Sequence, residues 1–169
     1  GAPCDSVGMP VRVTTGEMYL SHSDATVGSL NLSRSYSSKR LTTGRYGVFG
    51  LGWNSSLEER LNFPETGVIE ARSAGGSPSY FVDDNSDGTY ESAQPPDPLT
   101  WIETVAGGFK KKHAAGGEEV FSAVGRLTSV TDASGVVTTY TRNGSNQLTL
   151  ATRQGRSLAF TYNGTLLQS

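Results

Sequence analysis

The sequence of 169 residues contains little cysteine, little charge and no long apolar run. Cys4 is the single cysteine, so the chain cannot form an internal disulfide, and a small fold stapled by disulfides is excluded. Charged residues make up 18% of the chain and the formal net charge is −2, which leaves no basic field to hold nucleic acid or an anionic membrane. The apolar stretches last only a few residues, whereas a membrane-spanning helix needs about 20. We therefore expect neither nucleic-acid binding nor membrane insertion, and we see no export signal in these residues.

Helix signals are almost absent as well. Hardly any window of about twelve residues combines apolar residues at helical spacing with freedom from Gly and Pro. Gly, Ser and Thr supply 60 of the 169 residues, a composition that favours turns and β-ladders. The sequence therefore predicts an all-β fold, an antiparallel twisted sheet built from hairpins.

Short strand patterns recur along the chain and are separated by turn residues. Residues 29–36 alternate with period two, which places Arg34 and Tyr36 on one face together with two leucines. In the second half, strand patterns follow one another at a spacing of about ten residues. Because no linker stands out, we place a division near Pro64, between an opening segment of residues 1–64 and a hairpin segment of residues 65–169, and we expect one continuous sheet to run through both.

The last third of the sequence repeats itself with a period of 20 to 22 residues. Leu127 and Leu148 are 21 residues apart, and Tyr140 and Tyr162 are 22 apart. Such a period is typical of a β-repeat array, in which each unit buries its apolar face against its neighbours. We expect the array to continue in a longer protein. The residues expected to line the repeat interiors are Leu127, Val130, Tyr140, Leu148, Leu150, Phe160 and Tyr162.

Four blocks of sequence stand out, which are residues 8–17 (GMPVRVTTGE), 30–38 (LNLSRSYSS), 47–53 (GVFGLGW) and 120–127 (VFSAVGRL). Together they resemble the Rhs (YD-repeat) family. The first three resemble, in order and spacing, the domain that opens the repeat region of Rhs proteins, and the fourth resembles the core of one repeat. The structural motif residues that the resemblance identifies are Gly16, Glu17, Arg34, Tyr36, Gly47, Gly50, Gly52, Trp53, Gly125, Arg126 and Leu127.

The resemblance implies a fold and a function. Rhs repeats form a long β-sheet that spirals into a hollow shell, which often encloses a C-terminal toxin or other cargo. The implied partners are the rest of the repeat array and that cargo, the implied location is secreted or at the cell surface, and the implied role is structural rather than enzymatic. The Tyr-Asp pair that names the repeats is altered here, since Tyr140 precedes Thr141 and Tyr162 precedes Asn163. A sheet cut within such an array also exposes an edge, so we expect self-association through that edge.

One acidic turn has the spacing of a calcium loop. Asp83, Asn85 and Asp87 alternate before Gly88 and could supply three oxygen ligands. The twelfth position of such a loop is Gln94, which lacks the carboxylate that completes the site. We therefore favour a solvated Asp-Gly hairpin turn, with no cofactor, over bound calcium.

A Gly-rich segment with aromatic residues suggests an alternative function. Tyr46 and Phe49 lie among glycines, and rings presented in this way can stack on sugars, so a cell-surface module that binds carbohydrate or protein is the alternative to the shell. The competing interpretation is that the glycines allow sharp turns while Trp53 fills the core, and we favour it.

No catalytic constellation stands out. His22 and His113 each have hydroxyl or charged neighbours in sequence, but a nucleophile needs a base and an orienting group brought together in space. Glu58 and Glu59 could form a glycosidase pair, but adjacent residues on a strand point to opposite faces and cannot flank one bond, so we interpret them as strand surface and turn polarity. The lysine run of residues 110–112 is interpreted as the solvated edge of a hairpin.

Overall fold

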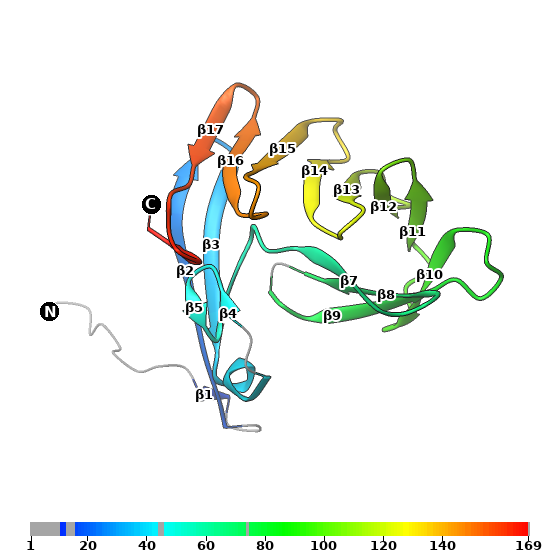
Figure 1. Cartoon of the computed structure of the whole chain (residues 1–169), viewed down its shortest axis with the longest axis horizontal. Coiled ribbons are helices and arrows are strands. Elements are labelled where there is room, and N and C mark those ends of the chain that lie inside the picture. Colours follow the sequence, from blue (N-terminus) through cyan, green and yellow to red (C-terminus); the bar gives the residue numbers. More distant parts are fainter. Residues whose placement is uncertain (1–10, 13–15, 44–45, 74, 169) are drawn as a thin grey trace, which may run out of the picture.

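The computed structural model describes residues 11–12, 16–43, 46–73 and 75–168, and these residues form antiparallel β-structure almost throughout. Figure 1 shows the arrangement of the strands. The first group of elements comprises β1 (Val11–Arg12), β2 (Glu17–Val27), β3 (Leu30–Ser37), the short 3-10 helix η1 (Ser38–Thr43), β4 (Tyr46–Gly47), β5 (Gly50–Leu51) and β6 (Trp53–Ser55). The second group comprises β7 (Arg60–Glu65), β8 (Val68–Arg72), β9 (Pro78–Val82), β10 (Thr89–Gln94), β11 (Thr100–Val105), β12 (Gly108–His113), β13 (Glu118–Ser122), β14 (Leu127–Thr131), β15 (Val137–Arg142), β16 (Leu148–Arg153) and β17 (Arg156–Ala159). A last hairpin comprises β18 (Tyr162–Asn163) and β19 (Leu166–Leu167).

Two main sheets contain most of these strands. The first has the order β1-β2-β3-β6, and the second contains eleven strands, β7 to β17, in chain order. Every pairing is antiparallel, so each new strand of the large sheet is added by a hairpin to the one before it. The expected all-β, hairpin-built antiparallel fold is confirmed. Within the described ranges, no helix has the length and apolar character that a membrane crossing requires.

The large sheet bends back on itself. The backbone N–H of Leu61, on the outer strand β7, donates a hydrogen bond of 2.8 Å to the carbonyl oxygen of Gly125, in the turn between β13 and β14. Arg60 and Arg126 form an isolated antiparallel bridge beside it. Because β7 and β14 are far apart in the strand order, this link closes the curl around an apolar core. The buried residues of this first core are Leu61, Ile69, Ala71, Phe81, Ile102, Phe121 and Leu127.

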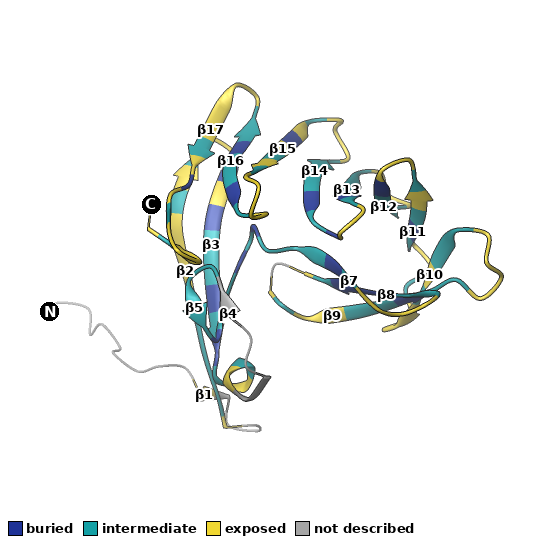
Figure 2. Cartoon of the chain, in the orientation of Figure 1, coloured by how far each residue is buried: buried dark blue, intermediate teal, exposed yellow. Residues whose placement is uncertain are grey.

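A second core joins the two main sheets. It combines leucines of β3 and of the turn after β6 with apolar residues of β16 and of the segment after β17. Figure 2 shows buried positions on both β3 and β16, the strands at which the sheets meet. The buried members are Leu30, Leu32, Leu57, Leu148, Ala151 and Phe160.

The chain changes sheet earlier than the expected division near Pro64. The first sheet ends at Ser55 and the second begins at Arg60, so β7 runs through the proposed boundary. The described residues also form two main sheets rather than the single continuous one that we expected. The physical reason is the turn at residues 56–59, which places Leu57 in the second core and redirects the chain. The division into two domains stays a prediction.

Two further expectations were wrong. Lys110, Lys111 and Lys112 lie on β12, which is paired on both sides, and not at a sheet edge. Their ammonium groups lie 2.8–3.1 Å from carboxylates of the two neighbouring strands, which is why an inner strand tolerates three lysines. Leu150 lies outside both buried cores, because the register shifts between Thr141 and Arg142 and turns Ala151 inward instead.

Candidate functional site

The residues of the opening motif converge where β3 meets β6. The guanidinium carbon of Arg34 lies 4.8 Å from the ring centre of Trp53 and 5.0 Å from that of Phe49. Tyr36 also packs against Trp53, with ring centres 5.5 Å apart. Arg34 also forms a salt bridge of 3.1 Å with Asp24. Trp53 is half-buried in this stack and does not fill the core, in contrast to our interpretation from the sequence.

The glycines of the opening motif shape the backbone around this contact and in the neighbouring turns. Gly52 has φ +80°, and a Cβ there would lie 2.7 Å from the Tyr36 ring, so only glycine allows Tyr36 to reach Trp53. Gly47 and Gly50 pair across β4 and β5. Gly16, with φ +64°, directly precedes Glu17, the first residue of β2.

Glu17 accepts a hydrogen bond of 2.5 Å from the hydroxyl of Ser37, which ties β2 to the end of β3. The motif residues thus join three strands of the first sheet.

The aromatic residues proposed as a sugar platform are only partly available. Phe49 is half-buried, packs against the second core and lies under Arg34. The side chain of Tyr46 lies outside the described residues. Glycan binding stays a prediction, but the cover that Arg34 provides to the Phe49 ring gives it little support.

The acidic turn uses its oxygens for its own backbone. Asp83 accepts hydrogen bonds from the N–H groups of Asp87 and Gly88, both at 3.1 Å. Asp87 accepts from the N–H of Thr89 at 2.8 Å, and this bond lowers the pKa of its carboxyl below the usual range. The amide of Asn85 donates to Asp87 at 3.1 Å. No group of three or more His, Cys, Asp or Glu side chains suited to a metal occurs within the described ranges. The calcium hypothesis stays a prediction.

His113 meets a hydroxyl and a carboxylate, an arrangement that resembles part of a catalytic triad. Its Nδ1 lies 3.2 Å from Thr100 Oγ1, and its Nε2 lies 3.4 Å from Glu119 Oε1. The Thr100 hydroxyl, however, donates at 2.7 Å to Asp97, and this hydrogen bond is the main reason that the pKa of Asp97 lies below its ordinary value. Thr100 is also buried. A hydroxyl that donates to a carboxylate has no proton directed at the imidazole, so the geometry does not activate a nucleophile. His22, on β2, is exposed.

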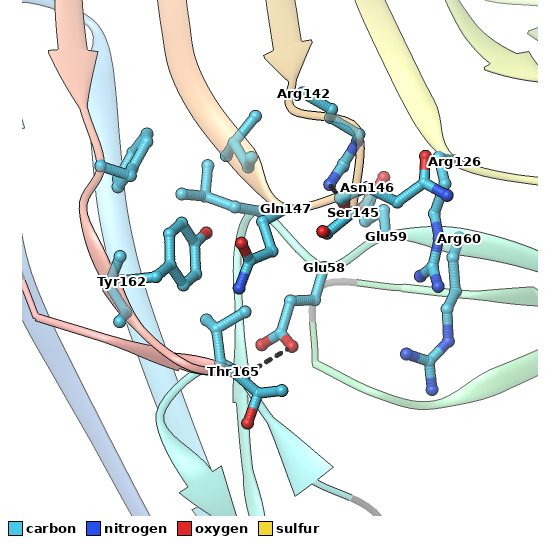
Figure 3. A pocket seen from close by; sticks show the side chains of 15 residues that line it. Glu58, Glu59, Arg60, Arg126, Arg142, Ser145, Asn146, Gln147, Tyr162 and Thr165 are labelled. Carbon is cyan, nitrogen blue, oxygen red and sulfur yellow. Dashed lines mark hydrogen bonds between the residues drawn. The ribbon is translucent and has the colours of Figure 1, made fainter.

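A cavity of about 460 Å³ lies where the turn after β6, the loop between β15 and β16, and the last hairpin meet (Figure 3). Its walls combine an apolar surface with several charged and amide side chains. Its lining residues are Val48, Leu57, Glu58, Glu59, Arg60, Arg126, Arg142, Ser145, Asn146, Gln147, Leu148, Phe160, Tyr162, Thr165 and Leu167.

Glu58 is the most unusual group in this cavity. Its Oε1 accepts a hydrogen bond of 2.9 Å from the N–H of Val48. Its Oε2 is buried and has no hydrogen-bond partner among the described residues. Burial raises the pKa of Glu58, and hydrogen bonds from Val48 and Ser55 only partly oppose this effect. Our interpretation of Glu58 and Glu59 as strand surface and turn polarity did not anticipate this site, because both follow the turn after β6 and line the same cavity.

Two arginines approach the cavity from the large sheet. Arg142 donates to the carbonyl oxygens of Leu127, at 3.4 Å, and Asn146, at 3.2 Å. Burial lowers the pKa of Arg142, and the positive charge of Arg126 lowers it further. The structure shows no ion pair between Arg126 or Arg142 and the carboxylates of the described residues.

The second motif, residues 125–127, connects this cavity to the closure of the large sheet. A Cβ on Gly125 would lie 2.1 Å from the carbonyl oxygen of Leu61, so the close approach of β7 requires glycine there. Arg126 lines the cavity and Leu127 is 1% exposed in the first core. Of the motif residues identified from the sequence, Arg126 is therefore the one that reaches the cavity. Sequence reasoning missed Arg142 and the role of Glu58, since no local pattern brings residues 58, 126 and 142 together.

The fold defines the class of this protein. Consecutive hairpins that add strands in chain order and bury one apolar face against their neighbours are the mark of a β-repeat protein. No curated protein matches the chain at a significant level.

Two family models identify the particular family. A model described as Domain of unknown function (DUF6531) matches residues 8–81, and a model described as RHS Repeat matches residues 121–157. The chain is therefore an Rhs-repeat protein with an N-terminal domain followed by repeats, as its sequence motifs indicated.

Proposed function

We propose that the chain is a non-catalytic wall segment, the first part of an Rhs-type shell that encloses or displays a C-terminal toxin or other cargo. The observation that carries this proposal is the chain-order sheet of eleven hairpin-linked strands. In such a sheet each hairpin supplies the edge on which the next one pairs, so further repeats extend the same wall. Its partners would be the remaining repeats and the cargo, and it would act in a secreted or surface protein.

The two ends of the large sheet differ in a way that fits growth in one direction. The N-terminal edge, β7, is linked to Gly125 and so is partly covered. The C-terminal edge, β17, pairs with β16, and the sheet order gives it no second partner strand within the described ranges. The backbone groups on its outer side are therefore available to another strand, from later repeats or from a second copy.

The surroundings of His113 support a non-catalytic role. The contact of the His113 imidazole with a hydroxyl and a carboxylate leaves the Thr100 hydroxyl donating to Asp97. A hydroxyl nucleophile activated by an imidazole would need that proton directed at the base.

The test of this function uses the complete natural protein that carries this chain. Limited proteolysis should leave the C-terminal cargo segment of that protein intact in the wild type and should cleave it rapidly in Gly125→Ala. The substitution should break the contact between Gly125 and Leu61 that closes the large sheet. Gly155→Ala, in an open turn, is the matched control and should protect the segment like the wild type. Equal cleavage of the C-terminal segment in wild type and Gly125→Ala would contradict the wall role, as would ester, peptide or glycoside hydrolysis that His113→Ala abolishes.

A further inference from the structure

The cavity described above has the size and the lining of a small-molecule site. Its volume of about 460 Å³ lies within the range of roughly 300–1,000 Å³ that is common for ligand pockets. Segments far apart in the sequence build it: residues 57–60, residues 145–148 and the last hairpin, together with Val48, Arg126, Arg142 and Phe160. Such pockets typically combine an apolar wall with a few polar groups that converge on the ligand.

Glu58 supplies a hydrogen-bond acceptor without a donor. Figure 3 shows Glu58 between Tyr162 on one side and Arg60 and Arg126 on the other. A buried carboxylate oxygen without a partner is costly, because it has given up water and received no hydrogen bond in return. A ligand that places an O–H or N–H group against Glu58 Oε2 would remove that cost.

Arg126 and Arg142 supply positive charge and hydrogen-bond donors to the cavity. They interact unfavourably with each other, and the bonds that Arg142 makes go to neutral backbone carbonyls. Guanidinium groups bind carboxylates through short, charge-assisted hydrogen bonds. An anionic group placed between these two arginines would therefore relieve their mutual repulsion.

The overall charge of the lining favours a single negative charge on the ligand. Arg60, Arg126 and Arg142 stand against Glu58 and Glu59, which leaves one positive charge in excess. A carboxylate matches this excess better than a phosphate dianion does. Leu57, Leu148 and Phe160, all buried in the second core, form the apolar wall against which the body of a ligand would pack.

We propose that this cavity binds a small organic carboxylate that has an apolar body and a hydrogen-bond donor at its far end. Arg126 and Arg142 hold the carboxylate, the apolar wall holds the body, and Glu58 Oε2 accepts from the donor. This site does not depend on the wall role, since the cavity is complete within the described residues. The same chemistry could be presented by a free metabolite or by an acidic side chain of a protein segment.

The first experiment titrates the isotopically labelled chain with N-acetyl-tyrosine, followed by NMR chemical shifts. This probe has a carboxylate, an aromatic body and a phenol O–H. The matched probe is N-acetyl-tyrosinamide, which lacks only the charge. We expect shifts at residues that line the cavity, and an affinity for the acid about tenfold or more above that for the amide. Equal affinity for the two probes, or no shifts at the cavity with millimolar acid, would overturn the proposal.

The second experiment uses variants of the chain. Arg126→Gln should weaken binding of the acid about tenfold and leave binding of the amide unchanged, so that the preference for the acid shrinks, because Arg142 alone then holds the carboxylate. Glu58→Gln should weaken both probes, since the one remaining carbonyl oxygen accepts from the N–H of Val48 and an NH2 donor replaces the acceptor that faces the phenol. The controls are Arg156→Gln and Glu65→Gln, both at exposed positions away from the cavity, and they should bind like the wild type. If Arg126→Gln also bound the acid as the wild type does, the assignment of the arginine would be wrong.

A third arm separates the two sources of the carboxylate. A capped tripeptide with a central aspartate between leucines is titrated in parallel with N-acetyl-tyrosine. Tighter binding of the peptide would assign the site to an acidic protein segment, and tighter binding of the free acid would assign it to a small metabolite. Failure of both ligands would refute the site without affecting the wall role, which the proteolysis experiment tests separately.

Discussion

Gly125 is a position at which one added methyl group should disrupt the closure of the large sheet. The residue has φ +72°, its carbonyl accepts the hydrogen bond from Leu61, and a Cβ would lie 2.1 Å from the Leu61 carbonyl oxygen and 2.9 Å from the carbonyl carbon. Gly125→Ala therefore forces β7 away from the turn before β14. Gly155 has a nearly identical φ of +73° with nothing within 4 Å of its Cβ position, so Gly155→Ala experiences the same backbone strain without the clash.

The magnitude follows from three contributions. Left-handed backbone costs an alanine roughly 1–2 kcal/mol, and both variants pay this penalty. Gly125→Ala adds about 1–3 kcal/mol for overpacking against β7, and about 1–3 kcal/mol for the Leu61 N–H that loses its partner. The change in unfolded-state entropy is common to both substitutions and cancels in their difference. We expect Gly125→Ala to lower the free energy of unfolding by about 2–6 kcal/mol more than Gly155→Ala does.

Urea unfolding monitored by tryptophan fluorescence measures this difference. Trp101 lies on β11 within the curled sheet and reports on it directly. With a urea dependence of about 1–3 kcal/mol per molar, even a difference of about 2 kcal/mol moves the midpoint by roughly 1 M. If the two variants unfolded at the same urea concentration, the contact between Gly125 and Leu61 would not contribute to closure, and the account of the Gly-Arg-Leu motif given above would be refuted.

Three other predictions concern single side chains. Trp53→Ala should lower the free energy of unfolding by about 2 kcal/mol, less than the roughly 3–5 kcal/mol of a fully buried tryptophan, because Trp53 is half-buried. The control Val124→Ala, at an exposed side chain, should change it by less than about 0.5 kcal/mol. Equal urea midpoints for the two variants would contradict this prediction. The pKa of Glu58 is raised, so the folded chain holds the Glu58 proton more tightly than the unfolded chain does. Above the ordinary pKa of 4.5 the wild type should therefore lose stability with rising pH relative to Glu58→Gln. Parallel curves of stability against pH, measured by urea titration, would argue against this prediction. Hydrogen bonds from the Ser134 hydroxyl and Arg153 lower the pKa of Asp132. The Asp132 carboxylate should therefore stabilise the fold above its ordinary pKa of 3.8, and this stabilisation should disappear as the pH falls further. Acid unfolding of Asp132→Asn that matched the wild type at every pH would count against this prediction.

The fold class could be predicted from the sequence because its signals are local. Turn glycines, period-two strands and the period of 20 to 22 residues each act over short distances, and consecutive hairpins translate them directly into a sheet in chain order. Irregularities of register could not be predicted in this way. A shift between Thr141 and Arg142 is enough to exchange Leu150 for Ala151 in the core, although the leucine is the more apolar residue.

Edges are a second property that composition does not reveal. The lysine run on β12 has the composition of an edge strand, yet it lies within the sheet. Carboxylates on two different neighbours, Glu103 on β11 and Glu118 and Glu119 on β13, make that position tolerable. A charged strand can therefore lie inside a sheet when the strands that pair with it carry opposite charges at the facing positions. Only the register shows which residues face each other.

The cavity was missed because its groups belong to different parts of the fold. Glu58 leaves the first sheet, Arg126 follows β13, Arg142 ends β15 and Tyr162 begins the last hairpin. The closure between Leu61 and Gly125 holds the first two of these residues in place, since Arg60 pairs with Arg126 beside that link. The Gly-Arg-Leu motif thus couples a backbone contact, a cavity residue and a core leucine in three successive positions. A substitution at Gly125 should consequently disturb both the curl of the sheet and the geometry of the cavity, whereas a substitution at Arg126 should affect the cavity alone.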